Sequence, residues 1–176
     1  MKKNFMSGFY VFLAGAALLL CCAFPVSAQK TGIRKGKQAP DFSVKMTDGT
    51  ELMLSSLRGK PVLLHFWATW CPPCVRELPS VAKIAAERSD EITVLAISAG
   101  ETKETVSEYI NSKDGDFSSF VSGCDEDSSI SFMYNVTAIP YTLFISADGI
   151  ITDVQMGAYT PERLKSAVDK AVRTSE

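Results

Sequence analysis

Hydrophobic and polar residues alternate along this chain with two different periods, one typical of strands and one typical of helices. Short alternating runs flank an Asp-Gly pair at 48–49 and again at 148–149. An Asp-Gly pair between two alternating runs is a strong signal for a tight turn between antiparallel strands. The pattern therefore predicts one β-hairpin over 42–54 and a second over 142–154.

Between the two hairpins, longer apolar runs alternate with segments of helical spacing. The apolar runs, which are typical of buried strands, are 62–68, 92–97 and 117–121. Apolar residues recur at helical spacing over 72–88, 102–111, 129–134 and, with Thr160-Pro161 as a cap, 161–172. Strands that alternate with helices and end in a hairpin and a helix predict an α/β fold, with a mixed central sheet flanked by helices.

The stretch from Val62 to Pro79 changes from strand to helix at two cysteines. The turn reads Trp-Cys-Pro-Pro-Cys at 70–74. Cys71 is expected at the N-terminus of the helix, where unpaired N–H groups and the positive end of the helix dipole favour a thiolate. Cys74 follows one turn later, near enough to close a small disulfide. The stretch therefore predicts a redox-active dithiol.

This motif resembles the active site of the thioredoxin superfamily and is most similar to the extracytoplasmic thiol–disulfide oxidoreductases related to TlpA and ResA. The likeness is carried by Phe-Trp-Ala-Thr-Trp-Cys-Pro-Pro-Cys at 66–74, by Glu-Leu-Pro at 77–79, and by 39–42, 54–60 and 136–140. It covers roughly residues 36 to 172. The resemblance implies a thioredoxin fold with an N-terminal β-hairpin and a strand–helix unit inserted between Ile97 and Asp125.

Disulfide exchange needs one thiolate that attacks and a second thiol that resolves the mixed disulfide. Because the first helical N–H groups point at it, Cys71 is the candidate nucleophile, and the more shielded Cys74 is the candidate resolving cysteine. The resemblance implies that a cis peptide bond precedes Pro140 and that its loop faces the dithiol. Trp70, Ile139 and Pro140 are then expected to bind the substrate. An inert disulfide and an ordinary trans proline are the alternatives.

Two ionisable residues near the dithiol are candidates for proton transfer. TlpA- and ResA-like proteins often carry an acid at the position of Glu77, where it is implicated in proton handling; an exposed helix glutamate is the alternative. His65 stands six residues before Cys71, where thioredoxins have a buried aspartate. A neutral imidazole there could relay a proton to or from Cys74, and a hydrogen-bonded core histidine is the alternative. Cys124 is expected as a free, half-buried cysteine, with a third redox thiol as the alternative.

The first 28 residues are typical of a secretory signal peptide. Two lysines near the start are followed by an apolar run over 9–24 and by Val-Ser-Ala, a small-residue cleavage motif. We therefore divide the chain into a signal peptide at 1–28, a linker at 29–37 and a thioredoxin-like domain at 38–176. Export to the periplasm or cell envelope is expected, and an uncleaved membrane anchor is the alternative.

Loss of the signal peptide changes both the charge and the cysteine count. The chain has 18 basic and 20 acidic residues. Two of the lysines leave with the signal, so the mature protein is acidic and offers no basic stripe to nucleic acid. Cys71, Cys74 and Cys124 are too few for a scaffold held by disulfides. Structural zinc needs about four ligands, and the chain has one histidine, so neither a metal nor a cofactor is expected.

The two prolines of the motif bear on the direction of exchange. Neither has an N–H group, so a Cys71 thiolate loses two possible donors and relies on the N–H groups of Cys74 and Val75. A less stabilised thiolate favours a reductant. The sequence predicts a protein-disulfide reductase for exported proteins that contain cysteine, such as apocytochrome c, with a membrane electron donor of the DsbD type. The alternatives are a thiol oxidase or isomerase, a client-binding module with little turnover, and a thiol peroxidase.

Overall fold

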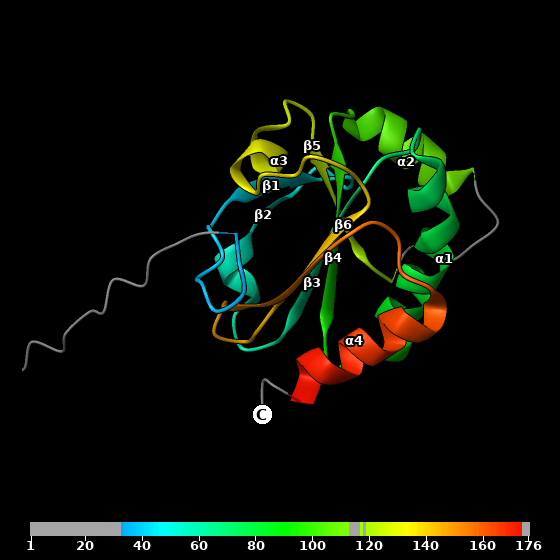
Figure 1. The fold of residues 1–176 in the computed structure, drawn as a ribbon. Helices are drawn as coiled ribbons and strands as arrows, with labels where there is room; N and C mark the ends of the chain where they lie inside the picture. The colour runs from blue at the N-terminus through cyan, green and yellow to red at the C-terminus, as the bar shows by residue number, and fades with distance from the viewer. Residues whose placement is uncertain (1–32, 113–116, 118, 174–176) are drawn as a thin grey trace, which may run out of the picture.

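The computed structural model describes residues 33–112, 117 and 119–173 of the chain. Within them, seven strands form one sheet in the order β2-β1-β5-β4-β3-β6-β7 (Figure 1). The strands are β1 (Ser43–Met46), β2 (Glu51–Met53), β3 (Val62–Trp67), β4 (Thr93–Ala99), β5 (Val121–Asp125), β6 (Tyr141–Ile145) and β7 (Ile151–Met156). β3, β4 and β5 are parallel, and the other neighbouring pairs are antiparallel. The predicted mixed sheet is confirmed.

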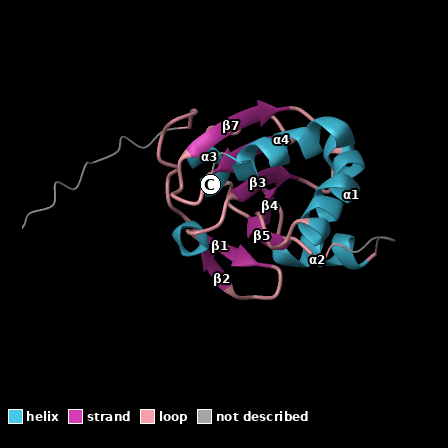
Figure 2. Ribbon diagram, turned by 90° about the horizontal axis from the view of Figure 1, so that it is seen from below, coloured by secondary structure: helices cyan, strands magenta, loops and turns pink. Residues whose placement is uncertain are grey.

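Helices cover both faces of this sheet. They are α1 (Pro72–Glu87), α2 (Lys103–Asn111), α3 (Ser129–Met133), α4 (Pro161–Arg173) and a short 3-10 helix, η1 (Leu54–Leu57). Figure 2 shows α1, α2 and α4 on one side of the strands. All six residues of β3 are buried. Because side chains alternate along a strand, Leu63 and Trp67 join the core under α1, whereas Leu64 and Phe66 join the core on the side of α3.

Both predicted hairpins are present. β1 pairs antiparallel with β2, and β6 pairs antiparallel with β7. The glycine of each turn has a positive φ, 90° at Gly49 and 79° at Gly149, a region that glycine adopts without steric penalty. The Asp48 side chain accepts a hydrogen bond from the Thr50 N–H at 2.8 Å. The first turn is therefore closed by its own acid as well as by its glycine.

The prediction of a strand over 117–121 is wrong, because β5 begins only at Val121, where that apolar run ends. Phe117 and Phe120 are buried and contribute their rings to the core, not their backbone to the sheet. β5 itself is less hydrophobic and contains Gly123, at which a Cβ would lie 2.8 Å from a side-chain atom of β1. The close approach of β1 at Gly123 thus decides which residues of this segment pair in the sheet. The hydrophobicity of the sequence alone does not reveal that approach.

The segment that precedes β1 is hydrogen-bonded to the sheet at Gly36 and Lys37. The Gly36 N–H donates to the Ile151 carbonyl at 2.7 Å, and the Ile151 N–H donates to the Lys37 carbonyl at 2.8 Å. The expected signal peptide at 1–28 lies outside the described residues. Among the helices of the described part, none combines the length and the hydrophobicity that a membrane span requires.

Three turns meet at the edge formed by the carboxyl ends of the parallel strands. β3 leads into the turn before α1, and β4, which is paired with β3 through Trp67 and Ser98, leads into the turn before α2. The loop that precedes β6 reaches the same edge, because Tyr141 pairs with Phe66. In open α/β sheets this is the edge where functional groups gather.

Candidate active site

The two cysteines of the turn after β3 form a disulfide. Cys71 is the N-cap of α1, with an extended backbone at φ −97° and ψ 101°, and the prolines that follow occupy the first helical positions, where no N–H donor is needed. Cys71 is 4% exposed and Cys74 is 0% exposed. A thiol or disulfide that approaches from outside therefore reaches the sulfur of Cys71 first.

Among the residues that the structure describes, few hydrogen-bond donors surround the Cys71 sulfur. The Cys74 N–H points at it, with an N–Sγ distance of 3.4 Å. The Val75 N–H does not, because it donates to the Cys71 carbonyl at 3.0 Å and so closes the first turn of α1. The expectation that Val75 supports the thiolate is therefore wrong. The carbonyl oxygen of Ile139 lies 3.7 Å from the same sulfur, where its partial negative charge would disfavour a thiolate.

The loop before β6 lies beside the disulfide. The Ile139–Pro140 peptide bond is cis, as the resemblance implies. Pro140 is buried, and its carbonyl accepts a hydrogen bond from the Gly157 N–H at 2.8 Å. Trp70, which directly precedes Cys71, is 67% exposed. The structure thus brings Trp70, Cys71 and Ile139 to one edge of the protein.

Glu77 is buried, so it is not the exposed helix glutamate that the sequence left open as an alternative. It lies on α1 one turn after Cys74, and its Oε1 accepts a hydrogen bond from the Tyr159 N–H at 3.0 Å. Its Oε2 has no hydrogen-bond partner among the described residues. Burial raises the pKa of Glu77, and the Tyr159 N–H opposes this rise. A carboxyl group with a raised pKa can take up and release a proton closer to neutral pH.

His65 is fully buried in the middle of β3. It alternates with Leu64 and Phe66, so it lies on the face that α1 covers. Its Nδ1 is 3.0 Å from the Thr142 hydroxyl of β6, whereas its Nε2 has no partner within the described residues. Burial lowers the pKa of His65 to about 4, so the ring is neutral at pH 7. One nitrogen has the partner expected of a core histidine, and the other has none.

Glu101 is a further buried acid at this edge, and no motif in the sequence singles it out. Its carboxylate accepts hydrogen bonds from the Thr69 N–H, the Thr69 hydroxyl and the Ser98 hydroxyl. Thr69 lies two residues before Cys71. The local signal is an acid after a glycine at the end of a buried strand. That pattern is too common in proteins to identify a site. The residue that gives Glu101 its role, Thr69, lies 32 residues away in the sequence, so no local pattern reveals the contact.

Cys124 is a free, buried cysteine in β5. It pairs with Ser98 of β4, which in turn pairs with Trp67 of β3, so two strand spacings separate it from the strand that carries the dithiol. Burial, and to a lesser degree the charge of Glu101, raises the pKa of the Cys124 thiol to about 11. A thiol that stays protonated at neutral pH is a poor nucleophile. These features favour the free structural cysteine over a third redox thiol.

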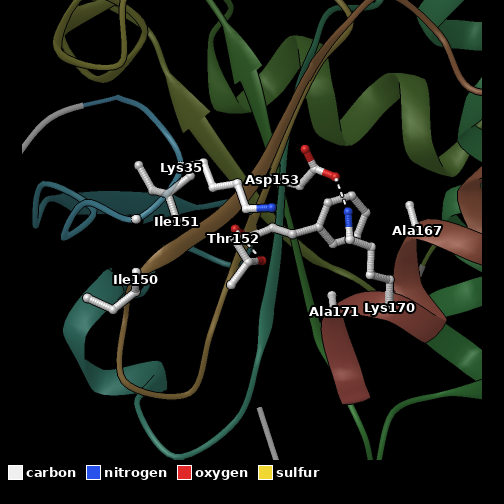
Figure 3. Close-up of a pocket in the computed structure, with 10 residues that line it drawn as sticks. Lys35, Ile150, Ile151, Thr152, Asp153, Ala167, Lys170 and Ala171 are labelled. Atoms are coloured by element: carbon white, nitrogen blue, oxygen red, sulfur yellow. Dashed lines mark hydrogen bonds and ion pairs between the residues drawn. The ribbon is translucent and has the colours of Figure 1, made fainter. Parts of the chain in front are cut away.

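A pocket between β7 and α4 is separate from the dithiol. Figure 3 shows its lining, with Ile151 on one side and with Lys170 and Asp153 joined by an ion pair of 3.5 Å on the other. Ile151 pairs with Ile145, which pairs with Val62 at the amino end of β3. The pocket is therefore at the opposite edge of the sheet from the cysteines.

Comparison with known proteins agrees with this geometry. The AhpC/TSA family profile matches residues 35–154. The thioredoxin-like protein YneN of Bacillus subtilis (strain 168) is 32% identical over 168 residues, which cover 90% of this chain and 96% of YneN. The thiol-disulfide oxidoreductase ResA of the same organism is 33% identical over 153 residues, which cover 83% of this chain and 84% of ResA.

Solved structures share the fold. The structure of dsbF from Mycobacterium tuberculosis (MTB), in mixed oxidized and reduced forms, matches with a TM-score of 0.68 and 29% identity. The match covers 81% of this chain and 99% of the other. The thioredoxin fold predicted from the motif is confirmed. Within it, the hairpin β1–β2 and the unit formed by α2 and β5 occur where they were expected.

Proposed function

Since this chain belongs to the AhpC/TSA family and is a thiol–disulfide oxidoreductase with a Cys71–Cys74 pair, we propose that it reduces disulfides of exported proteins. The Cys71 thiolate attacks one sulfur of a client disulfide, forms a mixed disulfide and releases the other client sulfur as a thiolate. Cys74 then loses its proton and attacks Cys71 Sγ, which closes the Cys71–Cys74 disulfide and releases the second client thiolate. The client gains two electrons, so a separate thiol donor must reduce the enzyme again.

The reducing direction rests on one observation, the scarcity of donors at the Cys71 sulfur. A thiolate there receives one backbone N–H, from Cys74 at 3.4 Å, and faces the Ile139 carbonyl oxygen at 3.7 Å. Strong oxidants of this fold are oxidising because their reduced form is stabilised. A poorly stabilised thiolate has the opposite effect and favours electron transfer from the dithiol to the client.

Trp70, Ile139 and Pro140 are the proposed contacts for the client. The exposed indole of Trp70 offers an apolar surface directly beside the attacked sulfur. The Ile139 carbonyl lies 3.7 Å from the same sulfur, and the cis bond to Pro140 fixes its backbone there for pairing with an extended client segment. A segment held between these groups brings its own disulfide to Cys71, the first sulfur it meets.

Closure of the internal disulfide requires a base, because Cys74 is buried and its proton has no direct path to water. Glu77 is the proposed acceptor, since it lies one turn away on α1 and its Oε2 has no partner among the described residues. His65 is a second proposed proton carrier on the same side of the sheet, with Nε2 as its open atom. The raised pKa of Glu77 makes its carboxylate a better proton acceptor than that of an exposed glutamate.

Export follows from the sequence of residues 1–28, which has the form of a secretory signal peptide, and the domain from residue 38 onward then works in the periplasm or cell envelope. An exported reductant has no access to cytoplasmic thiols. Its electrons therefore come from a membrane carrier of the DsbD type. Apocytochrome c is the proposed client class, because its paired cysteines must be reduced before haem is attached.

Reduction of insulin by the protein lacking residues 1–28 tests the direction, with glutathione equilibration as the second measurement. We expect a potential nearer to about −270 mV than to about −120 mV. Cys71→Ser should abolish exchange, whereas Cys74→Ala should accumulate mixed disulfides with clients from the cell envelope. Cys124→Ala is the matched control and should leave both properties unchanged. A potential close to the oxidising value would favour an oxidase, and faster alkylation of Cys74 than of Cys71 would reverse the two roles.

A further inference from the structure

We propose that Glu101 is a positioning residue for disulfide exchange. Its carboxylate anchors the turn that carries Cys71 and, through its charge, makes the Cys71 thiolate less stable. The inference rests on the proposed role of Cys71 as the attacking cysteine. It adds a residue that lies outside the Cys-x-x-Cys motif, in the turn that follows β4.

The anchoring is direct and involves both oxygens of the side chain. Oε2 accepts the Thr69 N–H at 2.9 Å and the Ser98 hydroxyl at 2.5 Å, and Oε1 accepts the Thr69 hydroxyl at 2.5 Å. Thr69 is thus held by its backbone and its side chain at once. The next two residues are Trp70 and Cys71, so this single residue is the fixed point from which the exposed indole and the reactive sulfur project.

The fold brings Glu101 to this position through two features of β4. Ser98 pairs with Trp67 of β3 in parallel register, so the chain leaves both strands at the same edge. Gly100 has φ +72°, a left-handed conformation in which most side chains are strained. Its N–H donates to the Asp125 carbonyl at 2.9 Å. The resulting turn directs Glu101 back toward Thr69 and away from solvent, where it is 7% exposed.

The charge of Glu101 is not neutralised by an ion pair. In the described part of the chain, the ion pairs involve other acids. A buried anion without a cation acts over a longer range than one in water, because the surroundings screen it less. Its effect reaches the neighbouring sulfur of Cys124, whose thiol pKa is raised by burial and next by Glu101. The same field acts against a thiolate at Cys71, two residues from the anchored Thr69.

Glu101→Gln separates charge from shape. The amide oxygen can accept from the Thr69 N–H and the Ser98 hydroxyl, and the amide nitrogen can donate to the Thr69 hydroxyl, which also accepts. The turn keeps its anchor and loses the negative charge. We expect alkylation of Cys71 by iodoacetamide to reach its half-maximal rate at a lower pH. The equilibrium constant with glutathione should shift three- to tenfold toward the reduced enzyme, which corresponds to ~15 to 30 mV in the oxidising direction.

The matched control is Glu108→Gln, which removes an exposed acid from α2. Both quantities should stay at the wild-type value in this variant. If Glu101→Gln behaves like Glu108→Gln, the proposed effect of the charge is wrong. If the wild type is alkylated at Cys74, the assignment of the attacking cysteine fails instead, and peptide mapping of the alkylated protein distinguishes the two failures.

Anchoring is tested by two variants that retain the charge. Thr69→Ala removes the hydroxyl donor on the active-site turn, whereas Thr50→Ala removes a threonine hydroxyl that donates to a carboxylate in the exposed turn of the first hairpin. Exchange with insulin should slow at least threefold in Thr69→Ala and remain at the wild-type rate in Thr50→Ala. Equal rates in the two variants would overturn the positioning role. This pair also decides the proposal if Glu101→Gln does not fold.

Discussion

His65 should make the folded protein unstable in acid, and His65→Asn should remove that sensitivity. The side chain is the one histidine of the chain and is completely buried in β3. Its Nδ1 contacts the Thr142 hydroxyl, while its Nε2 has no partner in the described residues that could stabilise an added proton. The native state therefore excludes the charged imidazole, whereas the unfolded state accepts it freely.

The magnitude follows from the two pKa values. Burial lowers the pKa of His65 from 6.5 to about 4, and each unit of difference corresponds to ~1.4 kcal/mol. Between these pH values the unfolded state holds a proton that the native state lacks, so the free energy of unfolding falls as the pH falls. The full stability is present above about pH 6.5, and ~3 kcal/mol is lost by pH 4. This is a large share of the ~5–15 kcal/mol typical of a domain.

Urea unfolding of the oxidised protein lacking residues 1–28, at several pH values from 7.5 to 4, measures this loss. The wild-type curve should fall more steeply than that of His65→Asn by ~3 kcal/mol over the range. Groups such as Glu77, whose raised pKa acts in the opposite direction, are present in both proteins and cancel in the difference. Parallel curves would refute the reasoning, as would an imidazole resonance in the native protein that titrates near pH 6.5.

Three other substitutions probe the site. Pro73→His restores one N–H and adds a potential cation beside the Cys71 thiolate, so the equilibrium with glutathione should shift about tenfold, or ~30 mV, in the oxidising direction; an unchanged or more reducing potential would contradict this. Glu77→Gln removes the proposed proton acceptor and should slow closure of the internal disulfide by about 10²-fold in stopped-flow measurements, and an unchanged rate would exclude that role. Trp70→Ala should raise the KM for insulin but not the KM for a small disulfide. Because the indole is exposed, the free energy of unfolding should stay within ~0.5 kcal/mol of wild type. Equal effects on both substrates would argue against a client contact.

The features of the fold that depend on neighbouring residues could be predicted from the sequence. The Asp-Gly turns specified both hairpins, and the run from Val62 into Cys71 specified the strand-to-helix turn. Each of these elements is determined by local conformational preference and by the periodicity of apolar residues. The helices follow for the same reason and lie nearly at their predicted bounds.

The features that depend on distant pairing could not be predicted. β5 is selected by its contacts with β1 and β4, and the more hydrophobic Phe117 and Phe120 fill the core as ring contacts. Likewise, the Val75 N–H was expected at the sulfur of Cys71, but the first turn of α1 uses it. The role of Glu101 depends on its contact with Thr69, which exists only once β3 and β4 are side by side.

The three buried ionisable groups near the dithiol differ in how completely the fold satisfies them, and this difference indicates what each can do. Both oxygens of Glu101 accept hydrogen bonds, so protonation there would disrupt the anchor of the active-site turn. Glu77 and His65 each keep one polar atom without a partner in the described residues. Glu101 is therefore suited to anchor the turn, and Glu77 is suited to exchange a proton, whereas burial keeps the His65 ring neutral. The pH dependence of disulfide exchange should therefore follow Glu77.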